Sequence, residues 1–121
     1  MMASFIDEAV ERIKSVYGEV SLRIGTDAGR TLVRIAKVDL YEGCQPPSTP
    51  MLLVLDPTQP KPSVYVQPGQ LLANGRAPKS TSPMMIGGES WMQFSFNIPW
   101  GEAHGIIRFI AAARQRFIQN D

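Results

Sequence analysis

Apolar and polar residues follow two successive patterns near the C-terminal end of the chain. In residues 92–98 every second residue is apolar, a period that predicts a half-buried strand. Pro99 ends that strand, because proline has no backbone N–H to donate to a neighbouring strand. After Trp100 apolar residues recur every three or four positions, which predicts a terminal amphipathic helix bearing Ile106, Ile107, Phe109, Ile110, Ala113, Phe117 and Ile118.

The same helical spacing occurs at the N-terminal end, over residues 4–17. Ser4 is suited to cap the start of this helix, and Gly18 is suited to end it in a left-handed turn. Charged residues occupy one side of the predicted helix. The apolar stripe on the other side consists of Phe5, Ile6, Ala9, Val10, Ile13, Val16 and Tyr17.

Four strands are predicted after the first helix. Alternation indicates a strand over residues 20–24, and residues 25–29, bounded by glycines, form a turn to a second strand over residues 31–41. The alternation slips within the second strand, which predicts a bulge near Ala36. Residues 51–55 are continuously apolar, as in a strand buried on both faces, and residues 63–67 form a shorter fourth strand.

Residues 68–90 show no periodicity and are rich in Gly, Pro, Ser and Lys. They predict a long irregular loop, which in a compact domain is either functional or mobile. No repeat or linker divides the chain, so residues 1–121 are expected to form one domain. A run of strands flanked by helices predicts an α+β fold: an N-terminal helix, a four-stranded antiparallel meander, a long loop and a C-terminal helix.

Composition narrows the classes of function. Twelve Lys and Arg against eleven Asp and Glu give a net charge of +1, so no nucleic-acid or membrane partner is expected. The N-terminal segment contains the acidic residues Asp7 and Glu8 and therefore does not resemble a signal peptide. We expect a cytoplasmic protein. One cysteine excludes an intrachain disulfide framework and a multi-cysteine zinc site. No metal-ligand spacing is present, and no cofactor is expected.

One group of large apolar residues suggests contact with another protein. In the alternating pattern Trp91 lies on the same face as the polar residues Gln93 and Ser95, so it is expected to be partly exposed. An exposed tryptophan beside an irregular loop is typical of a binding hot spot, and Met84 and Met85 would add adaptable apolar contacts. The alternative is that these residues fill the core, as Met and Trp do in most proteins.

The order of elements resembles the ubiquitin-conjugating (E2) fold, and divergent prokaryotic E2-like proteins in particular. The residues that carry the resemblance are the run Trp91-Met-Gln-Phe-Ser95 and the later Trp100, which opens a helix. The resemblance implies two partners, an E1-like activating protein and a ubiquitin-like modifier. E2 relatives meet E1 through their first helix, which here implies contacts by Asp7, Glu11 and Lys14.

The sequence departs from the E2 pattern at the nucleophile. Residues 68–100 hold no cysteine, and Cys44 lies between the second and third predicted strands, so it is interpreted as an incidental thiol. Ser90 and Ser95 flank the position that the E2 cysteine would occupy, and either could carry a modifier as an oxyester with His104 as a base. The alternative is that none of the three is catalytic. Ser90 would then be a turn residue, Ser95 a solvent-facing strand residue and His104 a polar residue near the start of a helix.

Three hypotheses for function follow. The first is an E2-like component of a bacterial ubiquitin-like conjugation system, in which a serine hydroxyl would carry the modifier as an oxyester. The second is an inactive E2 variant that acts as a scaffold. The third is an unrelated small α+β protein-binding module of the chaperone or immunity type, which acts by masking a partner.

Overall fold

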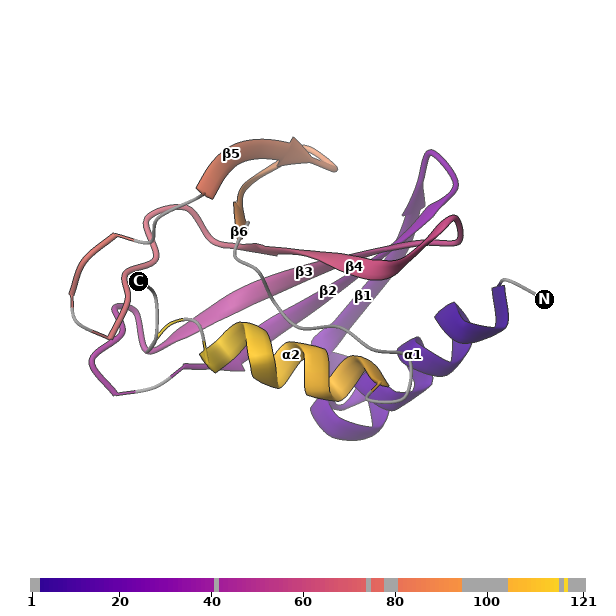
Figure 1. Ribbon diagram of the computed structural model, residues 1–121, viewed down its shortest axis with the longest axis horizontal. Helices are drawn as coiled ribbons and strands as arrows, with labels where there is room; N and C mark the ends of the chain where they lie inside the picture. The colour runs from indigo at the N-terminus through magenta and orange to yellow at the C-terminus, as the bar shows by residue number, and fades with distance from the viewer. Residues whose placement is uncertain are drawn as a thin grey trace.

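The structure is a computed structural model that describes residues 3–40, 42–73, 75–77, 81–94, 105–115 and 117. Two α-helices flank a run of strands (Figure 1). The elements are α1 (Ala3–Tyr17), the 3-10 turn η1 (Glu19–Ser21), β1 (Leu22–Asp27), β2 (Arg30–Asp39), β3 (Ser48–Asp56), β4 (Gln59–Val66), β5 (Thr81–Ile86), β6 (Glu89–Phe94) and α2 (Gly105–Gln115).

The sheet has six antiparallel strands, in the order β1-β2-β3-β4-β6-β5, and curls into a half-barrel (Figure 1). The predicted four-stranded meander is therefore wrong. Its four strands exist, but β5 and β6 extend the sheet beyond β4, and most of these two strands falls in residues 68–90, predicted to be an irregular loop. The prediction failed there because β5 has no alternation and contains Pro83.

Several local predictions are confirmed. Gly18, with a φ of 86°, follows the last residue of α1. The register between β2 and β3 shifts between Ile35 and Val38, which is the predicted bulge near Ala36. β3 is buried on both faces over residues 51–55. The first turn is tighter than predicted, because its two central residues are Ala28 and Gly29.

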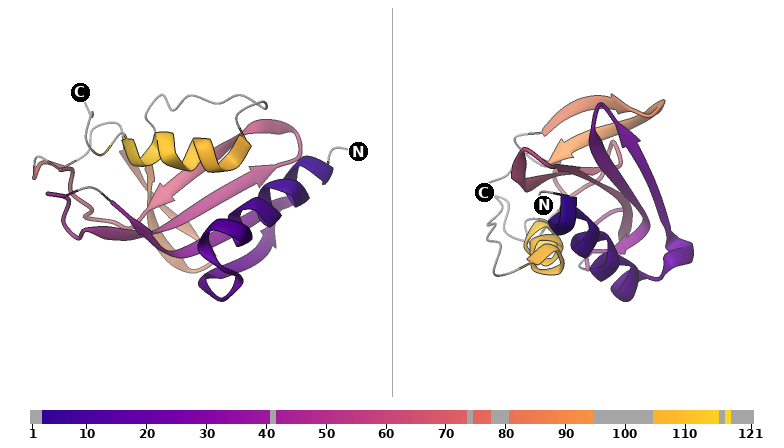
Figure 2. Two further views of the ribbon diagram at one scale, coloured as in Figure 1. Left: turned by 90° about the horizontal axis from the view of Figure 1, so that it is seen from below. Right: turned by 90° about the vertical axis from the view of Figure 1, so that its right-hand side faces the viewer.

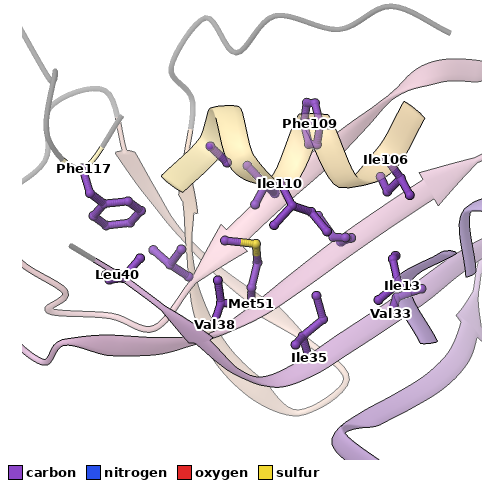
Figure 3. Packing of buried hydrophobic residues seen from close by; sticks show 14 of the residues in the cluster. Ile13, Val33, Ile35, Val38, Leu40, Met51, Ile106, Phe109, Ile110 and Phe117 are labelled. Carbon is purple, nitrogen blue, oxygen red and sulfur yellow. The ribbon is translucent and has the colours of Figure 1, made fainter. Parts of the chain in front are cut away.

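The main core lies between the two helices and one face of the sheet (Figures 2 and 3). α1 and α2 lie side by side on this face, and every second residue of β2 and β3 points toward them. Most of the stripe predicted for the C-terminal helix is buried: Ile106, Phe109, Ile110 and Ala113 in α2, and Phe117 beyond its end. Ile107 is half-buried, and Ile118 lies outside the described residues. The labelled residues in Figure 3 are Ile13, Val33, Ile35, Val38, Leu40, Met51, Ile106, Phe109, Ile110 and Phe117.

A second, smaller apolar cluster covers the opposite face of the sheet. It consists of Leu52 and Val54 of β3, Tyr65 of β4 and Trp91 of β6, all buried. These β3 residues alternate with Met51 and Leu53, which face the helices. The β5–β6 hairpin therefore packs on this face of the sheet, as the two helices pack on the opposite face. The same hairpin forms the candidate site.

Candidate functional site

The β5–β6 hairpin turns at two glycines and then leaves the plane of the sheet. Gly87 and Gly88 have φ values of 60° and 80°, and two positive values in a two-residue turn are typical of a type I′ hairpin. β6 pairs with β4 through Tyr65↔Gln93 and Val66↔Met92. Toward the turn the hairpin diverges from β4 and rises over the sheet (Figure 1).

Trp91 anchors this hairpin. Its side chain is 2% exposed and packs against Leu52, Val54 and Tyr65. The prediction that Trp91 is partly exposed is therefore wrong, and its predicted role in contacting a partner stays a prediction. The face of the strand on which Trp91 lies was predicted correctly, since Trp91 does face away from the main core. That face is buried because the hairpin packs against the sheet.

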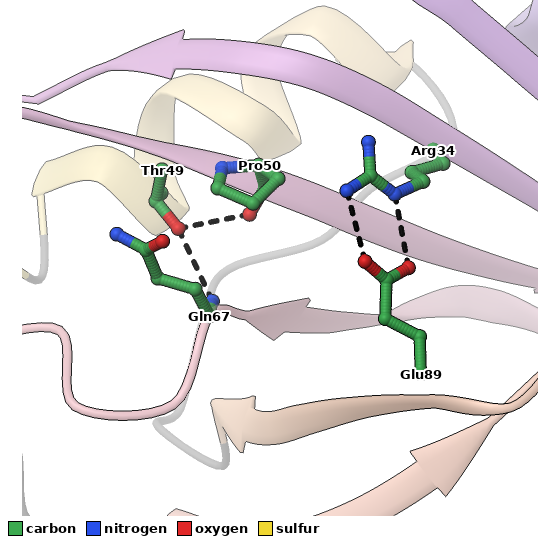
Figure 4. Close-up of polar contacts among 5 residues, drawn as sticks. All are labelled: Arg34, Thr49, Pro50, Gln67 and Glu89. Atoms are coloured by element: carbon green, nitrogen blue, oxygen red, sulfur yellow. Dashed lines mark hydrogen bonds and ion pairs between the residues drawn. The ribbon is translucent and has the colours of Figure 1, made fainter.

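An ion pair joins the hairpin to β2. The Arg34 guanidinium donates from Nε and Nη2 to the two carboxylate oxygens of Glu89, each at 3.0 Å (Figure 4). The Arg34 guanidinium carbon also lies 5.5 Å from the centroid of the Trp91 ring, within cation–π range. A bidentate pair fixes the direction of both side chains, so Arg34 and Trp91 hold the hairpin at one angle to the sheet.

We expect the Arg34–Glu89 pair to stabilise the fold only above the acid range. Hydrogen bonds from Arg34 hold the pKa of the Glu89 carboxyl below its ordinary value. The stability that this pair contributes is therefore fully present at pH values above the ordinary pKa. It is lost as pH falls through the lower pKa of the folded state. Both side chains are partly exposed, which limits the effect to about 1 kcal/mol or less. In urea unfolding, the difference between wild type and Glu89→Gln should be largest near neutral pH and vanish in acid. A difference independent of pH would contradict this account.

An apolar hollow of about 460 Å³ lies on the side of the hairpin next to the segment that follows β4. Met84 and Met85 of β5 stand at its rim, 42% and 66% exposed. As far as the chain is described, no charged residue lines it. Its lining is Pro68, Gly69, Pro83, Met84, Met85, Ser90, Trp91 and Met92.

A buried polar network fixes the wall of this hollow that contains Pro68 and Gly69. Gln70 is fully buried, and its side-chain amide donates to the carbonyls of Pro46 at 2.8 Å and Leu71 at 3.1 Å, while its Oε1 accepts from Gln67 Nε2 at 2.8 Å. The Gln67 backbone N–H donates to Thr49 Oγ1 at 3.2 Å (Figure 4). Buried polar groups that all have partners specify one conformation, so this part of the predicted irregular loop is ordered.

Ser90, the first predicted nucleophile, stands at the edge of the hollow. Its side chain is exposed, and its hydroxyl donates to the thioether sulfur of Met85 across the hairpin at 3.2 Å. A thioether does not remove a proton, so this contact does not activate the hydroxyl. Ser95 and His104, the other predicted catalytic residues, lie outside the described residues, as does Trp100.

The predicted partner face of α1 is separate from the hairpin. Asp7 and Glu11 are exposed, and Lys14 lies 3.5 Å from Glu11 and 3.9 Å from Glu19. Asp7, Glu11 and Lys14 lie on the solvated side of α1, where Lys14 pairs with Glu11 and with Glu19 beyond the helix. Their role in binding an activating protein stays a prediction.

The described residues contain no group of three or more His, Cys, Asp or Glu side chains able to hold a metal ion. Cys44 is buried in the main core. None of the described helices is both long enough and apolar enough to cross a membrane.

Comparisons with protein-family models, with curated proteins and with solved structures find no match to this chain.

Two features of the site were missed from the sequence. Arg34 and Glu89 lie 55 positions apart, and no local pattern marks them as partners. The hairpin did leave a signal, because Gly87-Gly88 is a strong two-residue turn sequence between two short runs of strand-compatible residues.

Proposed function

We propose that this chain is a protein-binding domain whose apolar hollow accepts an apolar side chain of a partner protein. The observation that carries the proposal is the pair of exposed methionines, Met84 and Met85, at the rim of an uncharged hollow. Exposed apolar residues are common singly, but their concentration around a concave site marks interaction surfaces.

The chemistry of the lining selects the partner. With no charged residue among the described lining, the hollow favours an uncharged side chain such as leucine or phenylalanine over an acidic or basic one. Methionine is flexible and polarizable, so Met84 and Met85 can adapt to side chains of different shape. The walls beneath them are fixed, because Trp91 and Gln70 are buried and the side chain of Gln70 is hydrogen-bonded to Gln67, Pro46 and Leu71.

A substitution at the rim tests the proposal directly. Peptides are selected from a random displayed library against the wild-type protein, and their affinities are measured by titration. We expect selected peptides to share an apolar anchor residue, and Met85→Lys to weaken their binding by roughly ten- to a hundredfold, since burying one methionine contributes about 1.5–3 kcal/mol.

The matched control is Val16→Lys, which places the same charge at another exposed apolar position, on α1. This control should bind the selected peptides as the wild type does. Failure to select any peptide, or equal loss of binding in both variants, would count against a site at the hollow.

The E2-like role stays a second proposal, supported by the exposed hydroxyl of Ser90 at the rim of the hollow. It is tested by intact mass after incubation with an E1-like activating protein, a ubiquitin-like modifier and ATP. An adduct that hydroxide removes, that thiol reductant leaves and that Ser90→Ala abolishes would indicate oxyester transfer. Binding without an adduct would leave the scaffold role.

A further inference from the structure

The two edges of the sheet differ in how they are protected against further pairing. The strand order places β1 at one edge and β5 at the other. β5 contains Pro83, which lacks a backbone donor and is typical of protected edges. β1 contains no proline, and its residues 23–27 are all exposed. An unprotected edge is a template for an additional strand.

The turn after β1 determines which of its backbone groups are open. Ala28 and Gly29 have φ values of 53° and 80°, as in a type I′ turn, and Asp27 lies opposite Arg30. In such a hairpin the two residues that flank the turn bond each other, and the direction of the backbone groups then alternates along the strand. The N–H and C=O groups of Ile24 and Thr26 therefore point away from β2.

We infer that β1 pairs antiparallel with β1 of a second copy of this chain, about a two-fold axis at Gly25. In this register Ile24 of each copy lies opposite Thr26 of the other, so the outward backbone groups bond each other. The same register places Arg23 of each copy opposite Asp27 of the other. Opposite charges directly across a strand pair are stabilising, and like charges are destabilising.

The side chains of β1 are suited to this pairing. Arg23 lies near Glu89 of the hairpin and interacts with its charge, but the described residues include no ion pair of Arg23 within 4 Å. The described ion pair of Asp27 is with Arg30, at 3.4 Å on the surface. Gly25, at the axis, presents no side chain to its counterpart. Ile24 is 46% exposed on the face that carries the helices, and in the dimer it lies diagonally next to Ile24 of the other copy.

The dimer surface is distinct from the apolar hollow, because none of the described residues that line the hollow belongs to β1. Each proposal can fail without the other. A contact built on one short strand from each copy buries little surface, so we expect a weak, reversible dimer rather than an obligate one.

The test is a charge reversal followed by mixing. Sedimentation velocity over roughly 10 to 1,000 µM protein should show wild-type dimers at the upper end of the range. Arg23→Asp gives two acidic positions on each β1, and Asp27→Arg gives two basic ones. Each variant alone should dimerise at least about tenfold more weakly than wild type, because both cross-strand pairs become repulsive.

Mixing the two variants restores opposite charges at both positions, so the mixture should form a heterodimer at least as readily as wild type dimerises. Thermal unfolding checks that each variant remains folded. A wild-type protein that stays monomeric at the highest concentration would overturn the inference. So would a dimer that ignores charge reversal, or variants that do not associate when mixed.

Discussion

Replacing Trp91 with alanine is expected to lower the free energy of unfolding by about 3–5 kcal/mol, the range for large aromatic residues removed from a core. Trp91 is 2% exposed and packs on Leu52, Val54 and Tyr65. Among the described residues, the other apolar side chains that pack against this cluster are Leu32 and Ile86, both only partly buried. Removing the Trp91 ring would therefore open a cavity over Leu52, Val54 and Tyr65. Urea unfolding monitored by circular dichroism measures the change.

The matched control is Met85→Ala, which removes an apolar side chain from the same hairpin at a position that is 66% exposed. It should change stability by about 0.5 kcal/mol or less, as is typical of surface substitutions. If Trp91→Ala also fell within that range, the hairpin would not pack on the sheet. Trp91 would then be the exposed contact residue that its sequence position predicted.

Trp91 also shows where sequence reasoning succeeded and where it failed. Alternation along residues 92–98 placed Trp91 on the face away from Met92, and the structure agrees: Met92 packs against the main core and Trp91 against the second cluster. Alternation reports which residues share a face. It does not report whether that face meets water, because that depends on a hairpin folding back from another part of the sheet.

The helices were predictable because their patterns are local. The stripes of α1 and α2 repeat at helical spacing, and Gly18 marks the end of α1. β5 was not predictable from alternation, because its sequence TSPMMI places Pro83 and two adjacent methionines in one strand. It is stabilised by pairing with β6 through six residue pairs from Thr81↔Phe94 to Ile86↔Glu89.

The candidate site was predictable only in part. Met84, Met85 and Ser90 were identified from the sequence, and the structure places all three at one hollow. Pro68 and Gly69, which form its other wall, were assigned to an irregular loop. Their position depends on Gln70, whose partners include the carbonyl of Pro46, 24 positions away. Contacts at such separation leave no periodic signal in a single sequence.

Replacing Gly43 with alanine is expected to cost about 2–5 kcal/mol of stability. Gly43 has a φ of 96°, a conformation that costs a residue with a Cβ about 1–2 kcal/mol. A Cβ at Gly43 would in addition overlap the backbone carbonyl oxygen of Ala73, and forcing extra volume into a packed site costs about 1–3 kcal/mol. Ala73 cannot move freely, because its N–H donates to the carbonyl of Phe117 at 3.0 Å.

Gly75→Ala separates the two contributions to that cost. Gly75 has a similar φ of 81°, but apart from its chain neighbours a Cβ there meets no atom of the described residues within 4 Å. Its substitution should therefore cost only the backbone strain of about 1–2 kcal/mol. Urea unfolding of both variants at one temperature gives the comparison.

Equal costs for the two variants would mean that the loop holding Gly43 can move away from Ala73. The close approach of these two loops would then not be what orders the segment after β4. A larger cost at Gly43 supports the opposite conclusion: the segment that forms one wall of the apolar hollow is positioned by backbone contact with the loop between β2 and β3.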